Sequence, residues 1–191
     1  MTNERNTPGV IEPSAGKTLE PALTCARAAL LGNPNTGKTT IFNRLSGLRH
    51  RTSNFPGTTQ EARIGHIAAG DDRTIELIDL PGVYSLELLQ SEADICRAVL
   101  SGELAPKGEA LAKPDALCVI VDATNLARGL TLVGEAVRRR LPMVVAVNMI
   151  DIARRSDVHI DCAKLAQRLG CPVAACSVRT GEGIAALRAA L

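Results

Sequence analysis

Glycine, lysine and hydroxyl side chains near the start of the chain have the spacing of a phosphate-binding loop. Residues 32–39 read GNPNTGKT, which fits the pattern G-x-x-x-x-G-K-[ST]. The glycines of such a loop let backbone N–H groups curl round phosphates, while Lys38 reaches the β- and γ-oxygens and the Thr39 hydroxyl coordinates Mg²⁺. The residues that we expect to bind a nucleotide here are Gly32, Asn33, Pro34, Asn35, Thr36, Gly37, Lys38, Thr39 and Thr40.

A second group of polar residues can select the base of that nucleotide. Residues 148–151 read NMID and follow an apolar segment. The Asp151 carboxylate can accept hydrogen bonds from N1–H and the 2-amino group of guanine, whereas adenine offers no donors there. Asn148 can tie this segment to the phosphate loop, and Ser177 stands where a third base-contacting loop belongs. We therefore predict guanine, with an ATPase as the alternative.

The segment 79–86, DLPGVYSL, bears on catalysis. Asp79 to Gly82 resemble a strand end that senses a nucleotide γ-phosphate, but the next residue is Val83. Many Ras-like GTPases have a glutamine at that position, which orients the attacking water. An aliphatic side chain cannot form this hydrogen bond. The sequence therefore predicts either slow hydrolysis that uses another group, or a GTP/GDP switch module with negligible turnover.

The composition limits the possible partners. The chain has 191 residues with a formal net charge of +2, no Trp, one Tyr and two Phe, so neither charge nor aromatic platforms favour nucleic acid. No apolar run has the length of a membrane span. The six cysteines include no CxxC pair, and His159, Cys162, Cys171 and Cys176 do not have zinc-site spacing. Reduced thiols account for them better.

The elements that must position these residues follow from the apolar patterns. Residues 1–24 read as a flexible tail, and residues 25–191 as one GTP-binding domain in which strands alternate with helices. This alternation predicts an α/β fold: a P-loop GTPase of the Ras-like type, with a mostly parallel six-stranded sheet and helices on both faces. The expected strands are 27–32, 62–70, 73–80, 114–123, 141–149 and 171–178, and the expected helices are 39–47, 91–102, 130–140, 161–170 and 181–191. The connection 102–114 is longer than this fold needs.

Several segments together resemble one family. The segments GNPNTGKTTIFNRLSG, NFPGTT, DLPGVYSL, VDATNLARGL and VNMIDIA are similar to those of the G domain of FeoB, the bacterial ferrous iron transporter. The resemblance runs from about residue 27 to residue 191, and its most specific elements are DATNL and Met149. Most translation-factor-like GTPases, including Era, EngA and MnmE, have lysine in place of that methionine. The resemblance implies a slow Mg²⁺-dependent GTPase that switches residues 52–62 and 80–90 with nucleotide state.

The resemblance also implies roles for single residues. Thr59 would ligate Mg²⁺ and sense the γ-phosphate, with Thr58 as the alternative, and Asp79 would hold Mg²⁺ through water. The Gly82 N–H would contact the γ-phosphate, and Asn35 would help to bind K⁺, which would assist hydrolysis in place of the missing glutamine. The catalytic set implied by the resemblance is Lys38, Thr59, Gly82 and Asn35, and the residues implied at the metals are Thr39, Thr59 and Asp79 for Mg²⁺ and Asn35 for K⁺.

The loop at Ser177, Val178 and Arg179 would be the last guanine-binding segment. It departs from the family pattern, which often has alanine where Val178 stands, and Met149 removes a cationic wall from the base pocket. Both departures favour modest nucleotide affinity and rapid exchange.

FeoB members also imply partners that this chain does not contain, namely a helical regulatory domain and a transmembrane iron-transport domain. We therefore expect a fragment that works at the cytoplasmic face of the inner membrane. The alternative is a soluble GTPase of tRNA modification or ribosome assembly. It would predict a lysine at Met149 and a basic patch or an RNA-binding domain, and neither is present.

Overall fold

The sheet at the centre of the molecule carries the predicted phosphate and base segments at one edge. The computed structural model describes residues 26–47, 50–68 and 73–191, so the predicted tail and the predicted turn at 70–72 lie outside the described residues. The strand order is β2-β3-β4-β1-β5-β6-β7. The strands are β1 (Ala26–Gly32), β2 (His50–Asn54), β3 (Glu61–Ala68), β4 (Thr74–Asp79), β5 (Ala116–Asp122), β6 (Met143–Asn148) and β7 (Val173–Ala175).

Five of these strands are parallel, because β4, β1, β5, β6 and β7 pair in register along one direction. β3 runs antiparallel to both β4 and β2 at one side of the sheet. The five middle residues of β5 are all buried, as expected for a parallel strand that is covered on both faces. The α/β fold class and the mostly parallel sheet are thus confirmed.

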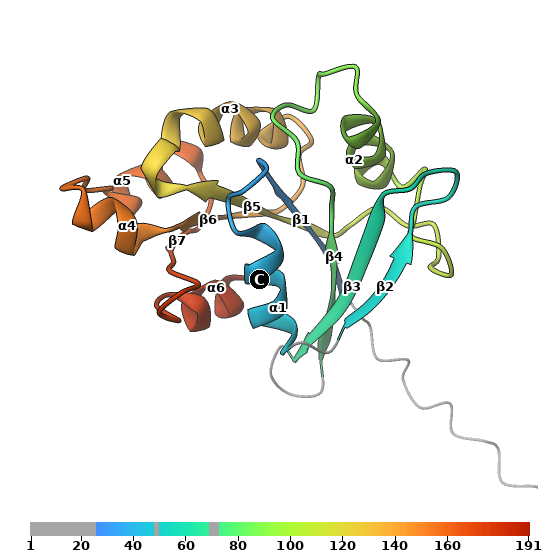
Figure 1. The fold of residues 1–191 in the computed structure, drawn as a ribbon, viewed down its shortest axis with the longest axis horizontal. Coiled ribbons are helices and arrows are strands. Elements are labelled where there is room, and N and C mark those ends of the chain that lie inside the picture. The colour runs from blue at the N-terminus through green and yellow to red at the C-terminus, as the bar shows by residue number, and fades with distance from the viewer. Residues whose placement is uncertain (1–25, 48–49, 69–72) are drawn as a thin grey trace, which may run out of the picture.

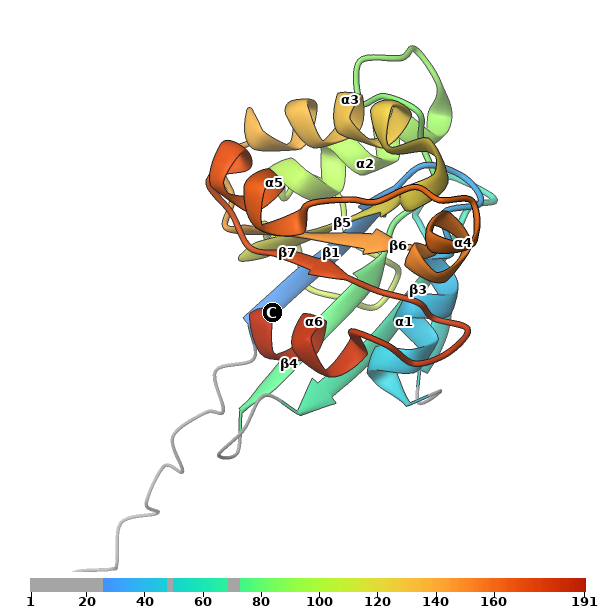
Figure 2. The same ribbon diagram turned by 90° about the vertical axis from the view of Figure 1, so that its left-hand side faces the viewer.

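Helices cover both faces of the sheet (Figures 1 and 2). On one face, α1 (Lys38–Ser46) and α6 (Ile184–Ala190) bury Ile41, Phe42 and Leu187 against β1 and β5. On the other face lie α2 (Ser91–Ser101), α3 (Leu126–Val137) and α5 (Cys162–Leu169). The short α4 (Ile150–Arg155) and the 3-10 turn η1 (Ala123–Asn125) follow the carboxyl ends of β6 and β5.

The strand count differs from the prediction. The sheet has seven strands rather than six, because β2 forms at residues that read as a polar loop. Four of its five side chains are exposed, so no alternation of apolar and polar residues marks it in the sequence. Its order comes from backbone pairing with β3 over residues 50–54 and 61–65. The predicted switch segment 52–62 therefore begins inside β2 and ends inside β3.

Two helices also differ from the prediction. α3 covers Leu126–Val137 rather than 130–140, since the chain enters it directly from η1 and leaves it before the three arginines at 138–140. Residues 150–155 form α4, which we did not predict. A helix of only six residues has too few apolar positions to show a helical period.

Candidate nucleotide-binding site

The phosphate loop connects β1 to α1, as its sequence predicted. Asn35 and Gly37 have φ values of 65° and 79°, so the loop turns through the left-handed region at two points. The Thr36 hydroxyl donates to the Asn33 carbonyl over 2.9 Å and braces this curve from within. A side chain at Gly37 is excluded, because its Cβ would lie 2.5 Å from Nδ2 of Asn148. The motif thus brings backbone N–H groups to the start of α1, where an anion is favoured.

Three polar side chains meet at the start of α1. The buried Lys38 ammonium donates to Oδ1 of Asp79 and to the Leu80 carbonyl. The Thr39 hydroxyl donates to Oδ2 of the same aspartate over 2.8 Å. The Asp79 carboxylate therefore lies between a cation and a hydroxyl group. Thr39 and Asp79 offer the hard oxygen ligands that Mg²⁺ prefers, so these residues fit that ion.

The DLPG segment lies against the phosphate loop. A Cβ at Gly82 would lie 3.2 Å from Cα of Pro34, which explains why the position needs glycine. The Val83 N–H donates to the Gly32 carbonyl over 3.1 Å, and Nδ2 of Asn33 donates to the Val83 carbonyl over 2.9 Å. The Val83 side chain itself is buried in the core. The residue in the place of the usual glutamine therefore acts in packing and does not face the phosphates.

The cavity at the phosphate loop has a volume of about 470 Å³. It is lined by Asn33, Pro34, Asn35, Gly37, Lys38, Thr39, Thr40, Gln60, Pro81, Gly82 and Glu92. Neither Thr58 nor Thr59 is among these residues, and Thr58 instead donates to the Phe55 carbonyl over 3.1 Å. Sequence analysis missed Gln60 and Glu92, whose side chains form a 2.9 Å hydrogen bond at this cavity.

The predicted base-binding residues also come together. Nδ2 of Asn148 donates to the Thr36 carbonyl over 2.8 Å, so it ties the two loops to each other as expected. Its Oδ1 accepts from the Val178 N–H over 3.2 Å. The Ser177 hydroxyl donates to Oδ1 of Asp151 over 2.7 Å. Met149, with φ of 63°, forms the turn between β6 and α4.

Arg179 is a partner of Asp151 that the sequence did not reveal. Its Nε and Nη2 donate to Oδ2 of the carboxylate over 3.0 and 2.6 Å. The hydrogen bonds from Arg179 and then from Ser177 hold the pKa of Asp151 below its ordinary value. The carboxylate is therefore ionised at neutral pH, as an acceptor for two donors of a guanine must be.

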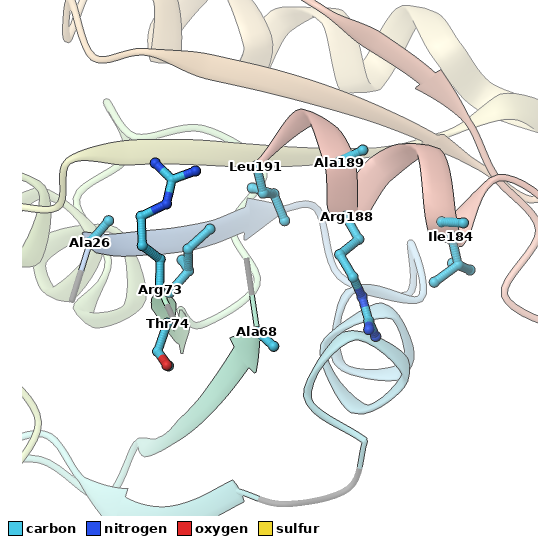
Figure 3. Close-up of a pocket in the computed structure, with 10 residues that line it drawn as sticks. Ala26, Ala68, Arg73, Thr74, Ile184, Arg188, Ala189 and Leu191 are labelled. Atoms are coloured by element: carbon cyan, nitrogen blue, oxygen red, sulfur yellow. The ribbon is translucent and has the colours of Figure 1, made fainter. Parts of the chain in front are cut away.

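A larger cavity, of about 660 Å³, lies elsewhere and has a different character. Figure 3 shows it between α6 and the ends of β1, β3 and β4. Alanine, isoleucine and leucine side chains line most of it, with Arg73 and Arg188 as its charged residues. It contains none of the predicted site residues. The polar groups that can do chemistry gather at the phosphate-loop cavity instead.

Comparison with known proteins decides the family. A family model described as "Ferrous iron transport protein B" matches residues 26–191. The chain belongs to the FeoB family. It is 41% identical over 167 residues to the Fe(2+) transporter FeoB of Salmonella typhimurium, which covers 85% of this chain, and 40% identical to that of Escherichia coli K12. It spans only about 20% of the length of these FeoB relatives.

Solved FeoB structures have the same fold. The G domain of FeoB from T. maritima matches 86% of this chain and 94% of its own, with a TM-score of 0.73 and 35% identity. A GMPPNP form of the T. maritima FeoB cytosolic domain gives a TM-score of 0.74 at 34% identity, covering 86% of this chain and 62% of its own. A GDP-bound S. thermophilus FeoB G domain gives 0.75 at 35%, covering 86% and 60%.

Membership of FeoB agrees with the P-loop GTPase fold that the sequence predicted, and it decides against the alternative of an RNA-modification GTPase. Among the described residues, no helix is long and apolar enough to cross a membrane.

Proposed function

We propose that this domain binds GTP and GDP and hydrolyses GTP slowly for a ferrous iron transport protein. The observation that carries this proposal is the bridge of Asn148, which holds the phosphate loop and the Asp151 loop together at one edge of the sheet. A guanine nucleotide spans that edge, with its phosphates at Lys38 and its base at Asp151. FeoB neighbours in GDP and GMPPNP forms support the same ligand class.

The metal sites follow from the oxygen donors. Thr39 and Asp79 would hold Mg²⁺, with Thr59 or Thr58 completing the set after the switch segment moves. Asn35 would contribute to a K⁺ site, because it lines the cavity and, within the described part of the chain, no hydrogen bond engages its side chain. When bound, both cations would neutralise charge on the phosphate oxygens.

The chain's own residues would then act on bound GTP. Lys38 would leave Asp79 for the β- and γ-oxygens, and the Gly82 N–H would donate to the γ-phosphate. Because Val83 is buried, a backbone group of a switch segment would orient the attacking water. The water oxygen bonds to the γ-phosphorus while the bond to the bridging oxygen breaks, which yields GDP and phosphate. Switch segments 52–62 and 80–90 would relax after phosphate leaves.

The place of the domain in the whole transporter is also a proposal. Because the chain spans about a fifth of its FeoB relatives, we infer that helical and membrane-embedded parts outside it respond to the switch segments. The domain would then act at the cytoplasmic face of the inner membrane.

GTP hydrolysis at matched ionic strength in KCl and in NaCl tests this proposal. We expect faster turnover in KCl for the wild type, and loss of that advantage in Asn35→Ala. Asn125→Ala is the control, since Asn125 is exposed and does not line the cavity. Equal rates in both salts would remove K⁺ from the mechanism. GDP binding without turnover in either salt would favour the second candidate, a nucleotide switch, which the burial of Val83 motivates.

A further inference from the structure

The long connection between α2 and β5 lies along the edge strand β2. This segment, residues 103–114, is called the strap below, and Figure 1 shows it as the yellow-green trace that returns beside β2. The Lys107 N–H donates to the Asn54 carbonyl over 3.0 Å. The Ser53 hydroxyl donates to the Lys107 carbonyl, also over 3.0 Å. Arg51 and Glu109 form an ion pair. The strap therefore contacts three positions of β2.

The base of the strap is fixed to the centre of the sheet. Nη1 of Arg27, on β1, donates to the Ala110 carbonyl over 3.0 Å. The Arg27 N–H donates to Oδ2 of Asp115 over 2.8 Å, where the strap meets β5. The two ends of the strap also touch, since a Cβ at Gly102 would lie 2.9 Å from the Lys113 nitrogen. An anchored segment of this kind can hold β2 in position, whereas a loose loop cannot.

β2 leads directly into the segment that carries the candidate Mg²⁺ threonines. The Phe55 side chain is buried, and its N–H donates to the Gln60 carbonyl over 3.1 Å. The Thr58 N–H donates back to the Phe55 carbonyl over 3.2 Å. This closed turn keeps Thr58 and Thr59 off the lining of the phosphate cavity. Carrying either threonine to the cavity must move the chain that starts beside Asn54.

We propose that the strap restrains β2 and thereby opposes the rearrangement that a γ-phosphate requires, so that it sets the preference between GDP and GTP. The inference rests on the proposed function, because it concerns the switch segment of that same site. A ligand shifts such an equilibrium only by its difference in affinity for the two arrangements. Loosening the strap should therefore strengthen GTP binding and leave GDP binding unchanged.

The turn at the tip of the strap allows a variant that removes one donor. The Glu109 N–H donates to the Pro106 carbonyl over 3.0 Å, and Gly108 has φ of 91°. This is the pattern of a type II turn, in which proline is common at the second position. Lys107→Pro therefore suits the turn and removes only the N–H that bonds to Asn54. Lys107→Ala is its matched control, because it retains the N–H and loses only an exposed side chain.

The first measurement is hydrogen exchange of residues 50–60 in the nucleotide-free protein, which needs no ligand. We expect exchange about three- to tenfold faster in Lys107→Pro than in Lys107→Ala, as for the loss of one backbone hydrogen bond. The second is the ratio of GMPPNP to GDP affinity, which should rise by a similar factor in Lys107→Pro alone. Unchanged exchange, or an unchanged ratio, overturns the proposal.

Two further arms separate the possible failures. If wild-type protein binds neither nucleotide, the proposed function fails, and the exchange comparison still decides whether the strap restrains β2. If Lys107→Pro does not fold, Ser53→Ala removes the hydroxyl donor to the Lys107 carbonyl. It should raise the affinity ratio about two- to fivefold, and an unchanged ratio overturns the proposal.

Discussion

The two ends of the candidate site differ in how they hold their charges. At the phosphate end, Lys38 and Asp79 pair in a buried setting, with side-chain exposures of 9% and 6%. At the base end, Asp151 pairs with Arg179, whose side chain is 64% exposed. A buried pair is little screened by water or salt, whereas an exposed arginine is screened strongly. The phosphate end should therefore supply affinity, and the base end should supply selectivity that solvent and salt can tune.

Removing the cation at the phosphate end should have the largest effect. We expect Lys38→Ala to weaken GDP binding by about 100-fold or more, because it deletes a phosphate ligand and leaves Asp79 buried without its cation. Calorimetric titration with GDP measures the loss, and a lower Tm should accompany it. Lys164→Ala, on the exposed surface of α5, is the control. A loss of less than tenfold would mean that Lys38 is not the main phosphate ligand.

Changing the carboxylate at the base end should exchange one base for another. In Asp151→Asn the amide can donate to the 2-oxo group of xanthine and no longer accepts from both guanine donors. We expect GDP affinity to fall by about 50-fold or more and XDP affinity to rise, as measured by competition against a fluorescent nucleotide. Asp157→Asn is the control, because asparagine tolerates its φ of 57°. Retained preference for GDP would show that Asp151 does not read the base.

Freeing Asp151 from Arg179 should have a smaller effect. The guanidinium occupies Oδ2, so a guanine must compete with it for that oxygen. We expect Arg179→Ala to tighten GDP binding about threefold in low salt, with a smaller gain at high salt. Arg168→Ala on α5 provides the matched control. Weaker binding in Arg179→Ala would instead make this arginine a ligand of the nucleotide.

The same pair predicts a small dependence on pH. Because the pKa of Asp151 is lowered in the folded protein, its contribution to stability is present above the unfolded value and is lost as pH falls through the folded value. GDP binding needs the ionised form, so affinity should fall along the same acid limb. In Arg179→Ala that limb should move to higher pH, within the range between about 3 and 5. Titrations across this range measure the shift, and coincident limbs would contradict it.

How far the sequence predicted the site depended on whether its residues are neighbours in the chain. The phosphate loop is one short motif between a strand and a helix, and the structure places it as predicted. The bridge of Asn148 to Thr36 was also foreseen, because both loops follow parallel strands. The pairing of Arg179 with Asp151 depends on where two separate loops meet, and no spacing in the sequence shows it.

The least predictable part is the edge that contains β2. Its polar side chains give no strand pattern, so its existence depends on pairing with β3 and on contacts with the strap. Gln60 reaches the phosphate cavity for the same reason, because it follows the turn that starts at Phe55. Local patterns identify elements with apolar periods, whereas a polar edge strand is defined by its neighbours.

Titration of the wild-type protein with GDP and with ADP, in the same buffer containing Mg²⁺, tests the two-ended site most directly. Both ligands offer identical phosphates to Lys38, so any difference in affinity comes from the base end. The site predicts that GDP binds at least about 100-fold more tightly, since adenine has no donors for Asp151 and leaves the carboxylate without a ligand. Equal affinities for GDP and ADP would contradict it.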